Sequence, residues 1–300
     1  MTTIFLPKDM QRIVPISLFI ILALFVIGFA IGSRGSVDRP VQPIYGSGNH
    51  EKDFYDQAYE RGEGEPVKAV TSAVVAHHLL IADKMAELFE DIGNEKTKTV
   101  IVVGPNHFSV GVSPAQITFG NYETVYGVVE NNVDGDEKLL AASSILKHEE
   151  KAFSNEHSIY TLTPFIKRSF PNAKIIPIIV HNKLSAADAW KLGSTIAKTF
   201  PDAVLIASVD MTHYHDQAFT DQNDAVILDR IEHGWKCNGL PCTDDVEIDS
   251  NASMRILSAF NEARQSTAWH LTDHDSSMLI GATTNPADNT SHILGYFTKE

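Results

Sequence analysis

From residue 69 onward, short apolar runs rich in β-branched residues alternate with longer amphipathic stretches, and this alternation limits the possible folds more than any other feature. Short apolar runs are typical of buried strands, and longer stretches with apolar residues three or four apart are typical of helices. The predicted strands are residues 69–76, 99–103, 173–180, 203–209 and 291–298, with antiparallel additions at 116–120 and 124–130. The predicted helices are residues 77–93, 136–150, 156–170, 185–200, 221–234 and 251–264. This order predicts an α/β fold, with a mainly parallel sheet that carries helices on both faces.

The composition is that of a folded chain with an acidic surface. The 300 residues include 43% hydrophobic and 21% charged residues, which is enough apolar material for a sizeable core in one large or two small domains. The formal net charge of -14 argues against a nucleic-acid-binding protein, because such proteins need a basic face.

An apolar segment near the N-terminus predicts a membrane anchor. Residues 13–33 carry no charge and are long enough to cross a hydrocarbon core of roughly 30 Å as a helix. A cleaved signal peptide normally has a shorter apolar region of about 7–15 residues, so we favour an uncleaved transmembrane signal anchor. The small residues at 30–32 leave cleavage open as the alternative. Residues 1–12 are expected in the cytoplasm and the remaining chain outside it, although basic residues flank both sides of the segment.

The chain after this segment divides into a linker and one domain. Residues 34–68 are rich in Gly, Pro and charge, which predicts a flexible linker, and residues 69–300 are the predicted α/β domain. Cys237 and Cys242 are the only cysteines, so a zinc knuckle with a second cysteine pair is excluded. They are either a disulfide or two free thiols, and a disulfide would agree with an extracytoplasmic domain.

Histidine and aspartate follow several of the predicted strands. His77 and His78 follow residues 69–76, and His107 comes two residues after a Gly-Pro turn at the end of residues 99–103. Asp210 and His213 follow residues 203–209. Ligands of parallel α/β sheets bind beyond the carboxyl ends of the strands, so a functional site is expected there. The other histidines near strand ends are interpreted as surface or structural residues: His181, His215, His270, His274 and His292.

Two neutral imidazoles and one carboxylate on one side of a site form a known metal-binding arrangement. It suits iron(II) with coordination positions left open, and the same ligands accept zinc, which would give a hydrolase. The chain lacks the Gly-x-Gly-x-x-Gly, Gly-x-Ser-x-Gly and phosphate-loop motifs, so the sequence favours a metal site over nucleotide binding or a serine nucleophile.

The order of the motifs resembles the Memo family, and in particular its prokaryotic branch, the AmmeMemoRadiSam system protein B. The resemblance runs from about residue 70 to 298 and rests on five segments: GPNH (104–107), YETVYGVVENN (122–132), NEHSIYTLTPF (155–165), KIIPIIV (174–180) and SVDMTHY (208–214). It implies a fold like that of the class III extradiol dioxygenases, which use non-haem iron.

The resemblance also implies site residues. His77 and His107 match the family's metal ligands, while His157, Asp210 and His213 match residues beside the metal that would handle protons. The chain has Ala-His-His-Leu at 76–79 where the family has Pro-His-Ala-Gly, so His77 or His78 is the first ligand.

The third ligand departs from the animal members of the family. Those members have a cysteine at a helix start, where this chain has Asp249. Asp249 is therefore the expected third ligand. The alternative is that Asp249 only caps the helix, in which case Asp210 supplies the carboxylate.

These features predict a membrane-anchored metalloprotein with redox chemistry, with iron as the expected metal and copper as an alternative. A small molecule or peptide is the expected ligand. The alternatives are a non-catalytic module that binds a peptide or anion, and a zinc-dependent hydrolase. Glu156, at the start of a predicted helix, is interpreted as complementing the helix dipole.

Overall fold

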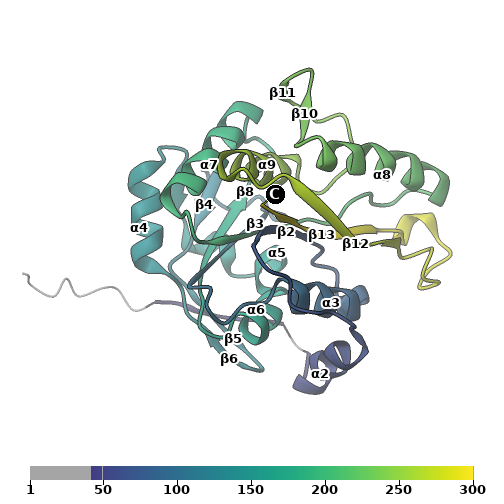
Figure 1. Cartoon of the computed structure of the whole chain (residues 1–300), viewed down its shortest axis with the longest axis horizontal. Coiled ribbons are helices and arrows are strands. Elements are labelled where there is room, and N and C mark those ends of the chain that lie inside the picture. Colours follow the sequence, from purple (N-terminus) through teal and green to yellow (C-terminus); the bar gives the residue numbers. More distant parts are fainter. Residues whose placement is uncertain (1–41, 49, 300) are drawn as a thin grey trace, which may run out of the picture. The chain divides into compact units, whose positions relative to one another are not determined.

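The computed structural model describes residues 42–48 and 50–299. Its centre is an eight-stranded sheet in the order β12-β13-β2-β9-β3-β8-β4-β7 (Figure 1). Its strands are β2 (Val70–Val75), β3 (Thr99–Pro105), β4 (Ala115–Ile117), β7 (Leu146–His148), β8 (Lys174–Val180), β9 (Val204–Ser208), β12 (Ala268–Ser276) and β13 (Ser291–Thr298). The four central strands β2, β9, β3 and β8 are parallel, whereas β13 pairs antiparallel with β2 and β4 pairs antiparallel with β8. The expected α/β fold with a large sheet is confirmed, and the sheet is mixed.

Helices cover both faces of this sheet, and each face has its own apolar core. On one face lie α4 (Val133–Ala142), α7 (Ala186–Thr199), α9 (Asn251–Arg264) and part of α8 (Gln217–Glu232). On the other lie α2 (Lys52–Arg61), α3 (Ala82–Ile92), α5 (His157–Tyr160) and α6 (Thr163–Ser169). The short helices are η2 (Leu79–Ile81), η3 (Glu150–Phe153) and η4 (Pro286–Asp288). A small sheet of β1 (Ile44–Gly46), β5 (Asn121–Thr124) and β6 (Gly127–Val129) completes the second face.

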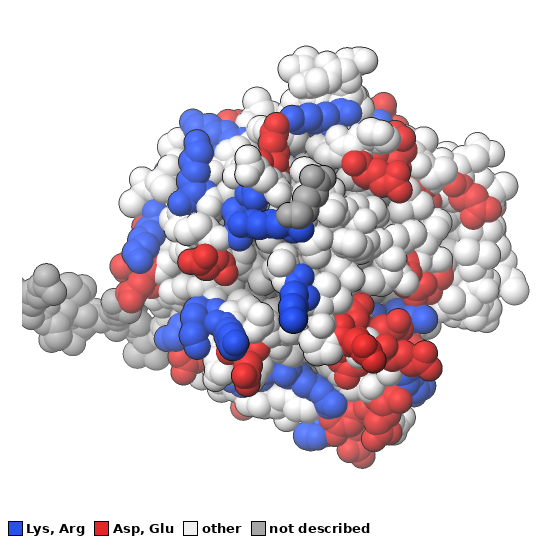
Figure 2. Space-filling model, in the orientation of Figure 1, with Lys and Arg blue, Asp and Glu red and all other residues white. Residues whose placement is uncertain are grey.

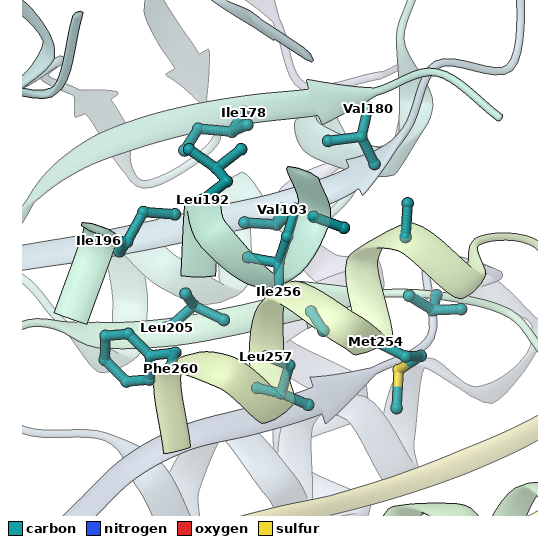
Figure 3. Close-up of a cluster of buried hydrophobic side chains, with 14 of the residues drawn as sticks. Val103, Ile178, Val180, Leu192, Ile196, Leu205, Met254, Ile256, Leu257 and Phe260 are labelled. Carbon is teal, nitrogen blue, oxygen red and sulfur yellow. The ribbon is translucent and has the colours of Figure 1, made fainter. Parts of the chain in front are cut away.

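The contact between α7 and α9 fixes the position of α9. Figure 3 shows side chains of both helices, among them Leu192 and Phe260, packed over strands of the sheet. A Cβ atom at Gly193 of α7 would lie 2.2 Å from the carbonyl oxygen of Ile256 in α9, so only glycine permits this approach. Burial of these apolar side chains is the main stabilising contribution to the position of α9.

Capping residues fix where the helices near the site begin. The Ser185 side chain accepts a hydrogen bond from the backbone N–H of Asp188, which confirms the predicted start of α7. Ser250 caps α9 in the same way through the N–H of Ser253. The N-terminus of α9 is therefore defined one residue after Asp249.

The predicted linker must be corrected for its second half. Residues 52–61 form α2, whose Tyr55, Ala58 and Tyr59 are buried against α3 and α6. Three aromatic or small side chains on one helical face provide the apolar surface, although the segment is polar on average. Figure 2 shows acidic side chains gathered over the region of α2 and α3.

Two of the predicted helices are wrong in part. Residues 136–150 divide into the end of α4 at Ala142 and strand β7, which pairs with β4. Residues 156–170 form two helices, α5 and α6, because Pro164 has no backbone N–H and is accommodated in the first turn of a new helix. Strand β12 has no counterpart in the prediction, since its polar sequence AWHLTDHDS lacks an apolar run.

Cys237 and Cys242 are joined by a disulfide, which settles the alternative that the sequence left open. It connects β10 (Lys236–Cys237) to β11 (Leu240–Pro241), a two-stranded hairpin beside α8 and α9.

The predicted membrane anchor at residues 13–33, together with residues 1–12, lies outside the described residues. Within residues 42–48 and 50–299, no helix has the length and apolar character that a membrane span requires.

Candidate metal centre

The carboxyl ends of three neighbouring strands bring the first site residues together. In the sheet, Val75 at the end of β2 is opposite Ser208 at the end of β9, and β9 lies next to β3. The residues that follow these strands, His77, Asp210 and His107, therefore emerge at one edge. The sequence prediction of a site at this edge agrees with the arrangement.

Two imidazoles and one carboxylate converge on one point. Asp249 Oδ2 lies 3.1 Å from His77 Nε2 and 3.3 Å from His107 Nε2. The two rings are nearly perpendicular, with centroids 5.1 Å apart and an interplanar angle of 83°. Three ligand atoms about 2.0–2.2 Å from one ion lie roughly 3.0–3.5 Å apart at tetrahedral or octahedral angles. The two separations from Asp249 fit that range.

The far nitrogen of each imidazole has its own polar partner. His107 Nδ1 lies 2.7 Å from Glu156 Oε1, and the backbone N–H of His107 donates to Glu156 Oε2 at 2.9 Å. His77 Nδ1 lies 3.0 Å from the hydroxyl of Ser208. The carboxylate on Nδ1 of His107 favours the tautomer with its proton there, which leaves the Nε2 lone pair for a metal. The Ser208 hydroxyl can accept from Nδ1 of His77 in the same tautomer.

The surroundings of Asp249 Oδ2 test whether a metal ion fits between these side chains. Its Oδ2 atom is buried and has no hydrogen-bond partner among the described residues. Two Nε2 lone pairs and this oxygen would repel one another, because all three accept and none donates. A cation at their meeting point, or protons on the two rings, removes the conflict. The residues therefore fit a divalent metal ion.

The pKa values of these groups also indicate that positive charge is favoured beside Asp249. Burial acts to lower the pKa of His77, but the carboxylates of Asp210 and Asp249 outweigh it and raise the pKa above its usual value. Burial also opposes protonation of His107, yet Asp249 and Glu156 raise the pKa of His107 to about 10. Burial would raise the pKa of Asp249, and the two imidazoles instead hold it well below its usual range.

His157 forms a third imidazole of the cluster. One ring nitrogen from each of His77, His107 and His157 lies within 4.8 Å of the others, so the three could hold a metal ion by distance alone. The ring of His157 is stacked on that of His107, with centroids 4.0 Å apart and an interplanar angle of 24°. Lone pairs lie in the ring planes, so those of two stacked rings run side by side and do not meet at one ion. This orientation favours Asp249 over His157 as the third ligand.

Asp210 supports His77 without replacing Asp249. Its Oδ1 accepts the backbone N–H of His77 at 2.9 Å, whereas its Oδ2 lies 3.7 Å from His77 Nε2. The backbone N–H of Asp249 donates to the carbonyl of Asp210 at 3.2 Å. Asp210 thus connects the end of β2 to the segment that carries Asp249.

His78 and His213 lie outside the convergent set. His78 Nδ1 lies 3.0 Å from His292 Nε2, and the buried His292 contacts Asp275 at 2.8 Å through Nδ1. His77 therefore lies beside His107, whereas His78 is turned to β13. His213 Nδ1 donates to the carbonyl of Met211 at 2.7 Å, and its half-buried ring lies beside Tyr214.

Sequence reasoning missed two supporting residues. Glu156 caps α5 through the N–H of Ser158, as an acidic residue at a helix start does, but its fully buried carboxylate also holds His107. Ser208, whose hydroxyl contacts His77, is the second. The sequence signal for Glu156 was its position directly before His157 in an Asn-Glu-His-Ser segment. The alternation of residues along the strand gave no signal for Ser208.

A cavity of about 360 Å³ opens beside the centre. It reaches from His107 and Asp249 along the start of α9 to Asp244 and Arg255. A small molecule in this cavity would lie next to the convergent atoms.

Comparison with known proteins gives the family. The family model described as Memo-like protein matches residues 57–282. A MEMO1 family protein of Caldivirga maquilingensis is 31% identical over 169 residues, which are 54% of this chain and 60% of the relative. One of Thermotoga maritima is 35% identical over 136 residues, which are 44% of this chain and 49% of the relative.

These alignments span between about half and 60% of the length of the curated relatives. Among solved structures, an uncharacterized protein from Escherichia coli K12 aligns with a TM-score of 0.49 and 11% identity, over 76% of this chain and 99% of that chain. The family model covers more than half of the 300 residues. The chain belongs to the Memo-like protein family.

Proposed function

We propose that the chain is a membrane-anchored, mononuclear metalloprotein that carries out redox chemistry with non-haem iron. His77, His107 and Asp249 would hold the ion through Nε2, Nε2 and Oδ2. The observation that carries the proposal is the buried Oδ2 of Asp249, which faces two imidazole nitrogens and has no hydrogen-bond partner among the described residues. Two imidazoles and a carboxylate are the ligand set of iron(II) sites with open positions, and copper or zinc would also bind them.

Open coordination positions are expected on the side of the cavity. His107 and Asp249 line it, whereas Ser208 and Glu156 contact the ligand rings through Nδ1. Bound iron would supply one-electron chemistry at those positions. The cavity would hold the substrate beside them.

Three further residues would handle protons or position ligands. Burial and the neighbouring His107 and His77 lower the pKa of His157 to about 4, so its ring is neutral at pH 7 and can accept a proton from a bound molecule. Asp210 would orient His77 through its backbone N–H. His213, half-buried after β9, is the proposed proton acceptor nearer to solvent.

The cellular location is part of the same proposal. The uncharged residues 13–33 support a single membrane anchor. The Cys237–Cys242 disulfide supports an extracytoplasmic domain, because disulfides persist mainly in oxidising compartments.

The experiment is elemental analysis of the full-length chain purified without chelator and without oxygen, followed by dioxygen uptake of the iron(II)-loaded protein with a reductant. About one iron per chain and dioxygen uptake that is lost in His107→Ala are expected. Zinc in the purified chain with no dioxygen uptake after iron loading would favour the hydrolase, and a chain that binds no metal would favour the non-catalytic binding module.

A further inference from the structure

The cavity beside the candidate metal centre is lined by one positively charged side chain. Arg255 is the only Lys or Arg among the described residues that line it, and its side chain is 2% exposed. His107 and Asp249 line the same cavity. A molecule bound there would therefore meet a metal ligand and a guanidinium.

The guanidinium of Arg255 is held by the disulfide hairpin. Its Nε and Nη2 atoms both donate to the carbonyl of Cys242, the former at 2.9 Å. Cys242 is fully buried, is joined to Cys237 by the disulfide, and donates its backbone N–H to the carbonyl of Trp235 at 3.0 Å. These contacts fix one edge of the guanidinium, and the group is thereby oriented before any ligand arrives.

Asp244 is the counter-ion of Arg255, and its exposed position allows another anion to replace it. Asp244 contacts Nη2 through a single oxygen, Oδ1, at 2.6 Å, and its side chain is 64% exposed. An exposed carboxylate loses little when water replaces its partner. A planar guanidinium binds a carboxylate best through two parallel hydrogen bonds, which Asp244 does not make.

The space between the two ends suits a small polar molecule. Along α9, Asn251 and Arg255 are four residues apart, a rise of about 6 Å at 1.5 Å per residue. Asn251 Oδ1 is buried without a hydrogen-bond partner among the described residues, and Asn251 and Asn182 both line the cavity, so amide groups are available to a bound molecule. Val180, Leu184 and Ile248 supply apolar contacts.

We propose that this cavity binds a small carboxylate-bearing molecule, whose carboxylate replaces that of Asp244 on Arg255 and whose opposite end lies beside His107 and Asp249. The inference rests on the proposed function, because the metal centre would act on that opposite end. It assigns the substrate class, and it assigns Arg255 as the residue that selects for the negative charge.

The test is calorimetric titration of the metal-loaded, full-length chain in detergent solution, with succinate as the probe and uncharged succinamide as its match. Succinate is expected to bind saturably and succinamide at least about tenfold more weakly. Arg255→Met is expected to weaken succinate binding at least about tenfold. Because a buried arginine is replaced, its fold is checked by circular dichroism, and Asp244→Asn provides a second measurement on a surface residue.

Asp244→Asn is expected to strengthen succinate binding about threefold or more, since it removes the competing carboxylate. Asp245→Asn is the matched control: it removes the same charge one residue later, from a carboxylate that pairs with Arg230. Its affinity should stay within about twofold of the wild type. Equal effects of the two substitutions, or none from Asp244→Asn, would overturn the inference.

Inorganic phosphate distinguishes the anion class. A single guanidinium is expected to bind phosphate more weakly than succinate, and tighter Arg255-dependent binding of phosphate would overturn the carboxylate assignment. Metal content is measured on the same samples. Arg255-dependent succinate binding in a chain that takes up no metal would refute the proposed function alone, and a metal-loaded chain without such binding would refute this inference alone.

Discussion

Asp249 Oδ2 lies 3.1 Å from Nε2 of His77 and is buried without a hydrogen-bond partner among the described residues. The same oxygen lies 3.3 Å from Nε2 of His107. A folded chain rarely leaves a buried carboxylate oxygen unsatisfied, because the lost hydration costs about 1–3 kcal/mol or more. A metal ion would supply the missing partner.

Glu156→Gln is expected to lower metal affinity about 10- to 100-fold. The amide keeps the size of the side chain and can still cap α5, but it loses the negative charge that orients and polarises His107. Affinity is measured by competition with a chromogenic chelator. Glu150→Gln breaks another contact between a glutamate and a histidine, at His148, and serves as the control. Equal losses in the two variants would contradict the role given to Glu156.

Metal binding is expected to release protons. In the metal-free chain, Asp249 and its neighbours raise the pKa of His107 to about 10, so its ring carries an extra proton at pH 7, and they also raise the pKa of His77 above its usual value, which favours a proton on that ring. Bound metal requires neutral imidazole, and affinity should therefore rise with pH up to about pH 10. Calorimetry of zinc binding in buffers of different ionisation enthalpy should give between one and two protons per ion at pH 7. Release of none would contradict the assignment.

The pH dependence of stability should contain a contribution from Asp136, which lies far from the metal ligands in sequence. Asp136 is fully buried in α4, and neither of its carboxylate oxygens has a hydrogen-bond partner within the part of the chain that the structure describes. Burial raises the pKa of Asp136 to about 9. The folded state thus binds a proton that the unfolded state releases near pH 4, so the contribution is fully present below pH 4 and is lost as pH rises toward 9.

Asp136→Asn removes this titration. The variant is expected to be more stable than the wild type at pH 9 by about 1–3 kcal/mol, and to show a flatter profile between pH 5 and pH 9. Urea unfolding at several pH values checks this. Parallel profiles for the two proteins would show that Asp136 does not titrate in this range.

Gly193→Ala is expected to lower the free energy of unfolding by about 1–3 kcal/mol. The added Cβ would lie 2.2 Å from the carbonyl oxygen of Ile256, which is backbone, so α7 and α9 must separate. Since α9 begins next to Asp249, metal affinity should fall as well. Gly46→Ala is the control, because a Cβ there meets nothing within 4 Å. A Gly193→Ala protein with wild-type stability would refute the close-packing argument.

The sequence predicted those parts of the fold and site that depend on apolar patterns. His107 was predictable because it follows the apolar strand that ends in Gly104-Pro105, and His77 because it follows another such strand. The choice between His77 and His78 depended on which side chain turns toward β13, where His292 accepts or donates to His78. That contact lies 214 residues away in the chain, and no local pattern reports it.

Other features escaped prediction for similar reasons. Helix α2 has a polar sequence, and only its contact with α3 and α6 makes Tyr55 and Tyr59 core residues. Strand β12 is recognisable only through its pairing with β13. Glu156 has a sufficient local explanation as a helix cap, which concealed its contact with His107.

The most direct test of the central claim is the metal content of the full-length chain and three variants, measured by elemental analysis after loading with iron(II) under identical conditions. The wild type and His157→Ala are expected to retain about one ion per chain, while His107→Ala and Asp249→Ala retain far less. An Asp249→Ala protein that folds and keeps the wild-type metal content would contradict the assignment of Asp249, together with the His77, His107 and Asp249 centre.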